Sequence, residues 1–237
     1  MIYIDKKRGI KLFLSLGINF IILIFLFYLM CLGFNPIIIS ILGCLLISTI
    51  ILYYVNGKNI KTETSLKSII IVLIILSILI FIMTNLTRIA GFGYESYEEI
   101  NMFSYNIKID FTNISISLIL ISLIGATTDT SIAISSALHE VYINNKNLSK
   151  KELYKSGLNI GKDVLCTTTN TLLFAFLSEF MTLIIWFYKC KYPILDVINN
   201  KVFVAELIKI LFSASGCVII IPITAYLMSN RLKKAKC

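Results

Sequence analysis

Six long runs of apolar residues, separated by short polar segments, make up most of this 237-residue chain. The runs cover residues 12–34, 36–55, 67–86, 113–137, 164–187 and 205–228. Each is close to the ~20 residues that an α-helix needs to cross the hydrocarbon core of a bilayer. The pattern predicts an all-α, polytopic membrane protein of about six transmembrane helices, built as a single integral membrane domain over residues 1–237.

Composition excludes a soluble catalytic domain. Hydrophobic residues make up 57% of the chain and charged residues 15%, against about 25% charged residues in soluble domains. The longest gap between apolar runs, residues 86–110, is too short to fold separately. The stretch from Leu12 to Phe34 follows a basic start, but it is too long for a signal peptide and no small-residue cleavage site follows, so it is expected to be a retained span.

The net charge of +9 comes from basic residues at the ends of the apolar runs. Such residues are topology signals and sit at the anionic inner leaflet, so nucleic acid is not an expected partner, whereas membrane lipids are. If the N-terminus is inside, sixteen Lys and Arg residues lie on the inner side and six on the outer side. This predicts that both termini are cytoplasmic, although the outer segment 189–201 is itself basic.

Recognisable catalytic or metal chemistry is not found in the sequence. There is one histidine, and there is no C-x-x-C pair, Cys/His cluster, G-x-S-x-G, H-E-x-x-H or phosphate loop. We expect no cofactor, no metal site, no disulfide and no enzymatic activity, with an intramembrane enzyme kept as a remote alternative. Cys31, Cys44, Cys166 and Cys217 fall within apolar runs, where they are expected to act as small packing residues.

The inner segment 139–163 carries its own helix signal. Ser149 and Glu152 have the spacing of a capping box, and Leu153, Gly157, Ile160 and Val164 recur at helical spacing. The prediction is a short amphipathic helix on the cytoplasmic face that leads into the fifth span.

Asp129 is the only ionisable side chain between Phe111 and Leu138. A carboxyl group inside hydrocarbon costs a few kcal/mol (about 2.5–3.5 on insertion scales), so such residues mark ion, proton or substrate paths. Gly125, Asp129, Ala133 and Ala137 recur every four residues, a small-residue stripe that favours close helix packing. The stripe predicts that Asp129 faces the protein interior.

The fifth span begins with the hydrogen-bonding run Thr167–Thr171. Because this run and Asp129 lie near the same ends of antiparallel neighbours, we expect Thr168, Asn170 or Thr171 to bind the carboxyl group. The alternative is that these polar groups only assist packing, since they contribute about 0.6 kcal/mol each in membrane helices.

Three further charged residues lie inside or beside the spans. Glu179 either continues a proton path from Asp129 or sits at the outer interface. Glu206 and Lys209, spaced i, i+3, are expected to pair.

One string of motifs resembles a known family. The stretches Gly125–Leu138, Leu148–Ser149, Glu152–Gly157, Gly161–Asp163 and Thr167–Leu172 look like the signature of the YibE/F family. Weaker agreement extends further back, to Lys61-Thr62 and Asn35-Pro36, so that the resemblance covers roughly residues 35–190. Thr167 and Thr169 stand where the family often reads Gly-Thr-Met, and Thr130 replaces a usual apolar residue, which puts the packing of the fifth span in doubt.

The resemblance implies a multi-pass protein of the bacterial cytoplasmic (inner) membrane, presumed to be a permease of unsettled substrate. The chain is similar to the shorter, YibF-like form, which implies a YibE-like companion subunit or a homo-oligomer. A more remote similarity links Asp129 and the Thr-rich run to the membrane core of the RND and SecD/SecF transporters.

From the residues and this resemblance we expect a permease or permease subunit. Asp129 and Glu179 are the candidate coupling residues, and Gly125, Thr168, Asn170 and Thr171 are the supporting polar interface. The rival hypothesis is a non-transporting scaffold or assembly factor, in which the same polar interface only holds helices together.

Overall fold

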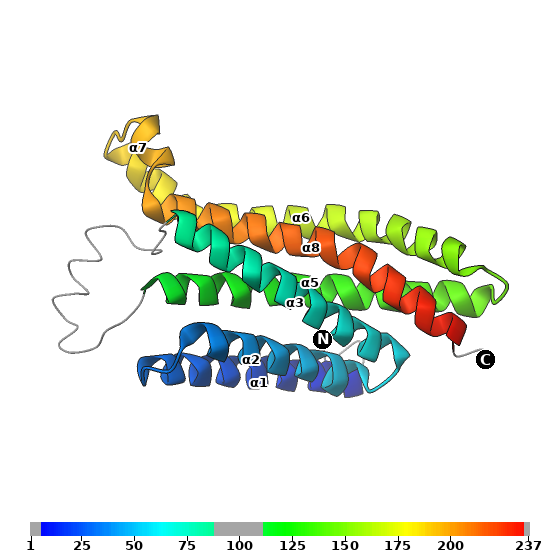
Figure 1. Cartoon of the computed structure of the whole chain (residues 1–237). Coiled ribbons are helices and arrows are strands. Elements are labelled where there is room, and N and C mark those ends of the chain that lie inside the picture. Colours follow the sequence, from blue (N-terminus) through cyan, green and yellow to red (C-terminus); the bar gives the residue numbers. More distant parts are fainter. Residues whose placement is uncertain (1–5, 88–110, 235–237) are drawn as a thin grey trace.

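The computed structural model describes residues 6–87 and 111–234, apart from the side chains at 6–8, 85, 87, 111 and 179. Every element within these ranges is a helix (Figure 1). The elements are α1 (Lys6–Cys31), α2 (Pro36–Thr49), the π-helical η1 (Ile50–Val55), α3 (Ile60–Thr87), α5 (Phe111–Asn144), α6 (Lys150–Lys189), the short α7 (Ile194–Ile198) and α8 (Lys201–Lys234).

The helices confirm the predicted all-α membrane architecture. Five of them are long and apolar enough to cross a membrane, and α6 makes a sixth if its two parts, bent by 44° at residue 179, count as one span. Several helices are longer than the apolar runs predicted. At ~1.5 Å per residue, the 34 residues of α5 and of α8 extend about 50 Å, well beyond the ~30 Å hydrocarbon core.

A tight turn joins the first two helices. Gly33 takes a positive φ of 86°, a conformation that glycine adopts without steric cost. Asn35 then caps α2, because its side chain accepts a hydrogen bond from the Ile37 amide, and Pro36 occupies the first helical position. The turn returns α2 and η1 antiparallel to α1 (Figure 1).

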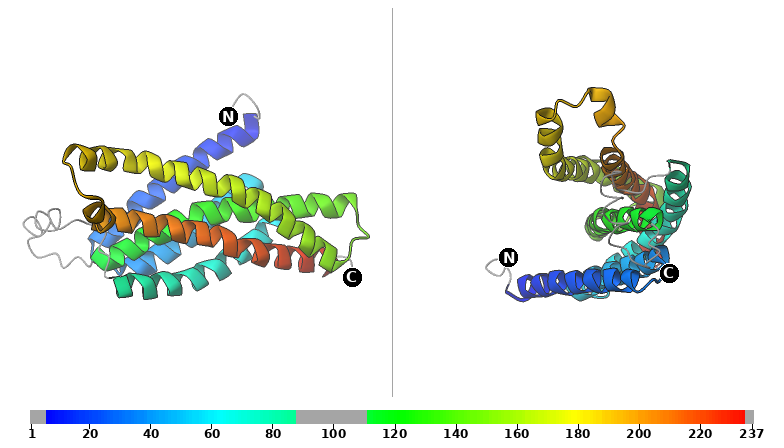
Figure 2. Two further views of the ribbon diagram at one scale, coloured as in Figure 1. Left: turned by 90° about the horizontal axis from the view of Figure 1, so that it is seen from above. Right: turned by 90° about the vertical axis from the view of Figure 1, so that its left-hand side faces the viewer.

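Helix α5 is the centre of the bundle. It packs against α2, α3, α6 and α8, whereas α1 packs mainly on α2 and η1. Viewed along the bundle, α5 lies in the middle, with α6 and α8 on one side and the α1–α2 pair on the other (Figure 2). The main apolar core, which includes Leu76, Leu120, Leu123 and Ile220, joins α3, α5 and α8.

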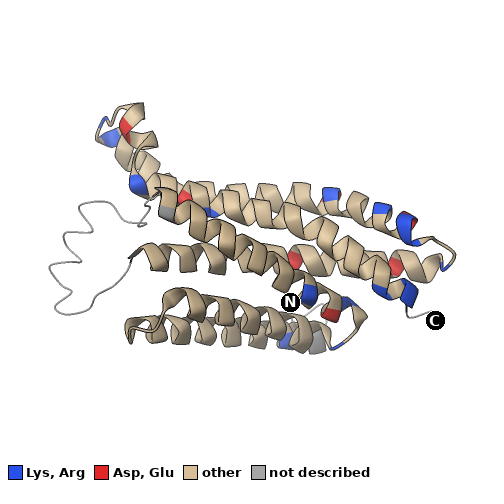
Figure 3. Ribbon diagram, viewed as in Figure 1, with Lys and Arg blue, Asp and Glu red and all other residues tan. Residues whose placement is uncertain are grey.

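Charged residues gather at one end of the bundle, here called the basic end, where α3 and α6 begin and α5 and α8 finish (Figure 3). Two ion pairs connect helices there: Lys61 of α3 with Glu140 of α5 at 3.3 Å, and Arg231 of α8 with Glu63 of α3 at 2.9 Å. A smaller charged group surrounds α7 at the opposite end. These ion pairs mark the level at which the apolar surface of the bundle gives way to polar surface.

The segment predicted to be a short amphipathic helix leading into the fifth span is helical, but it is not a helix of its own. Its residues form the first turns of α6, which continues without a break into the apolar part (Figure 1). The capping box is confirmed, since Ser149 and Glu152 exchange hydrogen bonds of 3.3 and 2.7 Å. Gly157 and Gly161 lie against Ala225 and Ile221 of α8, so this segment packs onto the bundle rather than lying apart from it.

Candidate functional site

Two faces of α5 carry polar residues, and they have different environments. The first is a hydroxyl seam, a set of buried Ser and Thr side chains that join α5 to its neighbours. Its interhelical contacts are Ser48 with Thr128 at 3.4 Å, Ser65 with Ser135 at 2.9 Å, Ser131 with Thr224 at 3.1 Å, Ser122 with Ser213 at 3.0 Å and Thr130 with the Cys217 Sγ at 3.6 Å.

Most hydroxyls of the seam have a second partner in their own helix. Ser65 also donates to the Lys61 carbonyl, Thr130 to that of Ala126 and Ser48 to that of Cys44. These hydroxyls are satisfied within their own helix, whereas Ser131 and Ser135 have their partners on other helices. The contacts between helices add only modest energy, about 0.6 kcal/mol each. The seam accounts for helix packing and contains no ionisable carboxyl or amine group.

Asp129 lies on a different face of α5 and is exposed, whereas its neighbours Thr128 and Thr130 are buried. It sits near the middle of α5, which runs from Phe111 to Asn144. Asp129 precedes Glu140, the α5 member of the Lys61–Glu140 ion pair, by eleven residues, which is a rise of about 16 Å along the helix. This is about half of the ~30 Å hydrocarbon thickness. The carboxyl group thus belongs to the middle of the apolar span, where its transfer from water is most costly.

The predicted burial of the small-residue stripe is wrong for the single chain. Gly125 and Asp129 are exposed, while Ala133 and Ala137 are half-buried. A methyl group added at Gly125 would have no heavy atom within 4 Å, apart from the local backbone. Among the described residues, therefore, no helix packs against α5 at Gly125, and the side chain of Asp129 one turn away is exposed.

The expected contact with α6 is not formed either. The Thr168 and Thr171 hydroxyls donate to the carbonyls of Val164 and Thr167 in their own helix, at 2.8 and 3.0 Å. Asn170 is exposed. Across the described ranges, no hydrogen bond joins Asp129 to α6, and the side chains of Thr167, Thr169 and Thr171 are exposed as well.

A polar pocket of about 230 Å³ lies at the basic end. It is formed between α5 and the turn that joins η1 to α3, a turn in which Gly57 takes a φ of 74°. The lining residues are Asn56, Asn59, Lys61, Thr62, Ile132 and Ser136. Sequence analysis missed this pocket, although the Asn-Gly-Lys-Asn turn was a visible signal of polar structure between two spans.

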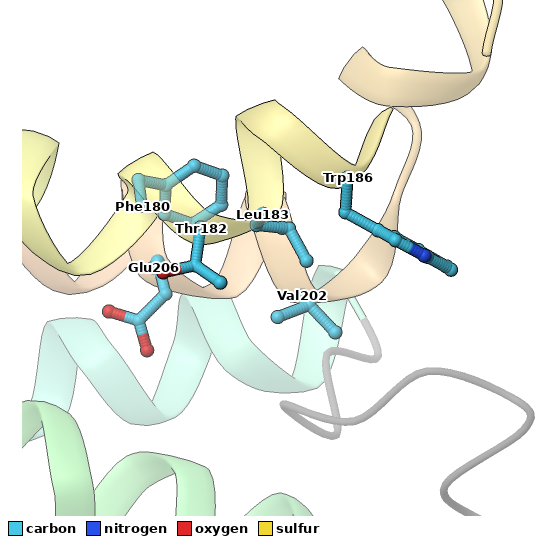
Figure 4. A pocket seen from close by; sticks show the side chains of 6 residues that line it. All are labelled: Phe180, Thr182, Leu183, Trp186, Val202 and Glu206. Carbon is cyan, nitrogen blue, oxygen red and sulfur yellow. The ribbon is translucent and has the colours of Figure 1, made fainter. Parts of the chain in front are cut away.

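A second, mainly apolar pocket of about 490 Å³ lies between α6 and α8 near the α7 end. Phe180, Thr182, Leu183, Trp186, Val202 and Glu206 line it (Figure 4). The predicted pairing of Glu206 with Lys209 is confirmed. The side chain of Glu179 lies outside the described residues, so its two alternatives stay open.

Among the described residues, no group of three or more His, Cys, Asp and Glu side chains is placed to hold a metal ion. Cys44 and Cys217 are buried packing residues, as predicted, whereas Cys31, Cys166 and Cys190 are exposed. The main candidate site is therefore Asp129 together with the polar pocket on the same side of α5.

Comparison with known proteins decides the family. The family model described as YibE/F-like protein matches residues 1–234, nearly the whole chain. The chain belongs to the YibE/F family. No curated protein and no solved structure matches this member of the YibE/F family, so the remote similarity to RND and SecD/SecF transporters has no support from these comparisons.

Proposed function

We propose that this YibE/F protein is a permease or permease subunit of the bacterial cytoplasmic membrane, with both termini in the cytoplasm and with Asp129 as its proton- or ion-responsive residue. The observation that carries the proposal is the exposure of Asp129 halfway along the central membrane helix. Packing alone does not require a carboxyl group there, and hydrocarbon strongly disfavours one.

Coupling would act through the charge of this side chain. A protonated carboxyl group is tolerated beside lipid or an apolar helix, whereas the charged form requires water, a cation or hydrogen-bond donors. A change in protonation or ion binding would therefore change whether the exposed face of α5 contacts lipid or an apolar helix, or instead water, a cation or hydrogen-bond donors. Neither the substrate nor the coupling ion is specified by the residues at the site.

The same observation supports a partner chain. Gly125 and Asp129 form a surface that is exposed within the described part of the chain, and a small residue such as Gly125 lets a foreign helix approach closely. A symmetric contact would bring two carboxyl groups together, which is unfavourable unless they share a proton. A different subunit that offers a donor or a cation is the better partner.

The test is the Asp129→Asn variant, purified gently with any companion and reconstituted for electrophysiology on a supported membrane. The wild type should give a transient current after a pH or ion jump, and Asp129→Asn should lose it while insertion and abundance stay normal. Asp196→Asn, which removes an exposed carboxyl group from α7, is the matched control and should keep the current. A wild-type current in Asp129→Asn contradicts the proposal.

A second function, a non-transporting scaffold, is favoured by the open space at Gly125. In that case Asp129→Asn should behave like the wild type, whereas a bulky residue at Gly125 or Ala133 should break the complex.

A further inference from the structure

Asp129 and the polar pocket share one face of α5. Asp129, Ile132, Ser136 and Glu140 follow one another at spacings of three and four residues, which places them on the same side of a helix. Ile132 and Ser136 belong to the pocket lining. The pocket therefore begins one turn from Asp129 and continues toward the basic end.

The pocket walls are suited to water. Five of its six lining residues are polar, namely Asn56, Asn59, Lys61, Thr62 and Ser136, around a space of about 230 Å³. A cavity needs only about 10–15 Å³ of this measure per water molecule, with two to four polar partners for each. At its edge, the Lys61–Glu140 ion pair has side chains that are 25% and 65% exposed, so the pocket is in contact with bulk solvent.

The same face of α5 has fewer polar groups in the other direction. Beyond Asp129 come Gly125, then Ser122 and then Leu118. Ser122 is the one polar side chain in these turns, and its hydroxyl already contacts the Ile119 carbonyl at 3.2 Å and the Ser213 hydroxyl at 3.0 Å. Polar groups that line an open space therefore continue from Asp129 toward the basic end, whereas toward the α7 end the one hydroxyl on this face has protein partners.

We propose that the polar pocket is a hydrated vestibule that brings water from the basic end to Asp129, while the α7 side of Asp129 is closed to water. Ile132, the apolar member of the lining, lies between Ser136 and Asp129 and forms the constriction. This inference rests on the proposed role of Asp129, because it names the side from which that residue exchanges its proton or ion.

The test measures hydration directly, with a membrane-impermeant, cationic methanethiosulfonate applied from either side of the membrane in right-side-out and inverted vesicles. Thiols react as thiolates, so labelling requires water at the site. Single cysteines would be placed at Ser136, Ala133 and Gly125, and at the control position Ile70. Ile70 is exposed on α3, nine residues or about 14 Å from Lys61, and is not part of the lining of the polar pocket.

The native thiols determine the background for this experiment. The exposed cysteines and the terminal one would be replaced by serine, namely Cys31, Cys166, Cys190 and Cys237. The buried Cys44 and Cys217 stay in place, and their residual labelling is subtracted.

Ser136→Cys and Ala133→Cys should label from the side of the basic end at least about tenfold faster than Ile70→Cys. Gly125→Cys should label as slowly as Ile70→Cys from both sides. The proposal is overturned if Ala133→Cys reacts no faster than Ile70→Cys, or if Gly125→Cys reacts rapidly from the α7 side. These rates need no transport assay, so they are separable from the outcome of Asp129→Asn.

Discussion

The glycines within the long helices fall into two groups, according to what a methyl group at Cα would contact. At Gly161 the methyl carbon would lie 2.2 Å from the Ile221 side chain, and at Gly157 it would lie 2.8 Å from both Ala225 and Leu138. Gly125 has no such neighbour. The first group is explained by packing within this chain, and Gly125 is not.

This difference gives a paired prediction. Gly161→Val should lower stability by about 1–3 kcal/mol, because the branched side chain must push α6 away from α8. Gly125→Ala should not destabilise the isolated chain, because it fills open space and favours the helix. Thermal unfolding of both variants in detergent measures this, and an equal loss in the two would show that α5 and α6 pack differently from the structure.

Among the elements, α6 combines a polar start with a membrane span in a single helix. Its first turn is fixed by the Ser149–Glu152 capping box, and Leu153, one turn beyond, is fully buried. Because the helix is continuous, a displacement of its basic end is carried directly to the Thr167–Thr171 segment. A displacement at the start of α6 is therefore expected to move the part of the helix that lies in the membrane.

Removing the cap should loosen the first turns of α6 specifically. Ser149→Ala should cost about 1 kcal/mol and raise amide hydrogen exchange over residues 150–158 about fivefold. Lys151→Ala, an exposed change in the same turn, should leave the exchange rates close to those of the wild type. If the two variants exchange alike, the capping box does not hold this end of the helix.

The parts of this fold that depend on span length or on residues close in sequence could be predicted from the sequence. Span lengths follow from bilayer thickness, and the Ser149–Glu152 cap depends on residues three apart. The surroundings of Asp129 were not predictable, because small and polar residues occur on more than one face of α5. Only the packing of the whole bundle shows that Ser131 and Ser135 face its neighbours and that Gly125 faces outward.

At the scale of the whole molecule, the bundle leaves one side of its central helix uncovered. Its tightest interhelical packing joins α5 to α3 and α8, and the α1–α2 pair approaches α5 only through α2. Figure 2 shows α5 open on the side between α6 and α1. This open side is where the proposed companion subunit would bind.

Native mass spectrometry of the chain purified gently from its own membrane should find a second membrane protein in fixed ratio. Gly125→Leu should abolish that association, since the leucine side chain blocks the approach of a helix to α5. Ile75→Phe, an enlargement on an exposed part of α3, should leave it intact. A wild-type chain that is found alone, or only with copies of itself, removes the companion subunit from the proposal.

The hydroxyl seam has a consequence for the rate at which α5 can move. Ser48, Ser65 and Thr130 each have a hydrogen bond to a carbonyl of their own helix, which they keep if α5 slides past α2, α3 and α8. Ser131 and Ser135, by contrast, contact Thr224 and Ser65 on other helices, so the activation free energy of such a shift is set by the exchange of these few partners. Helix register shifts in proteins take microseconds to milliseconds, which is the time range expected for a movement of α5.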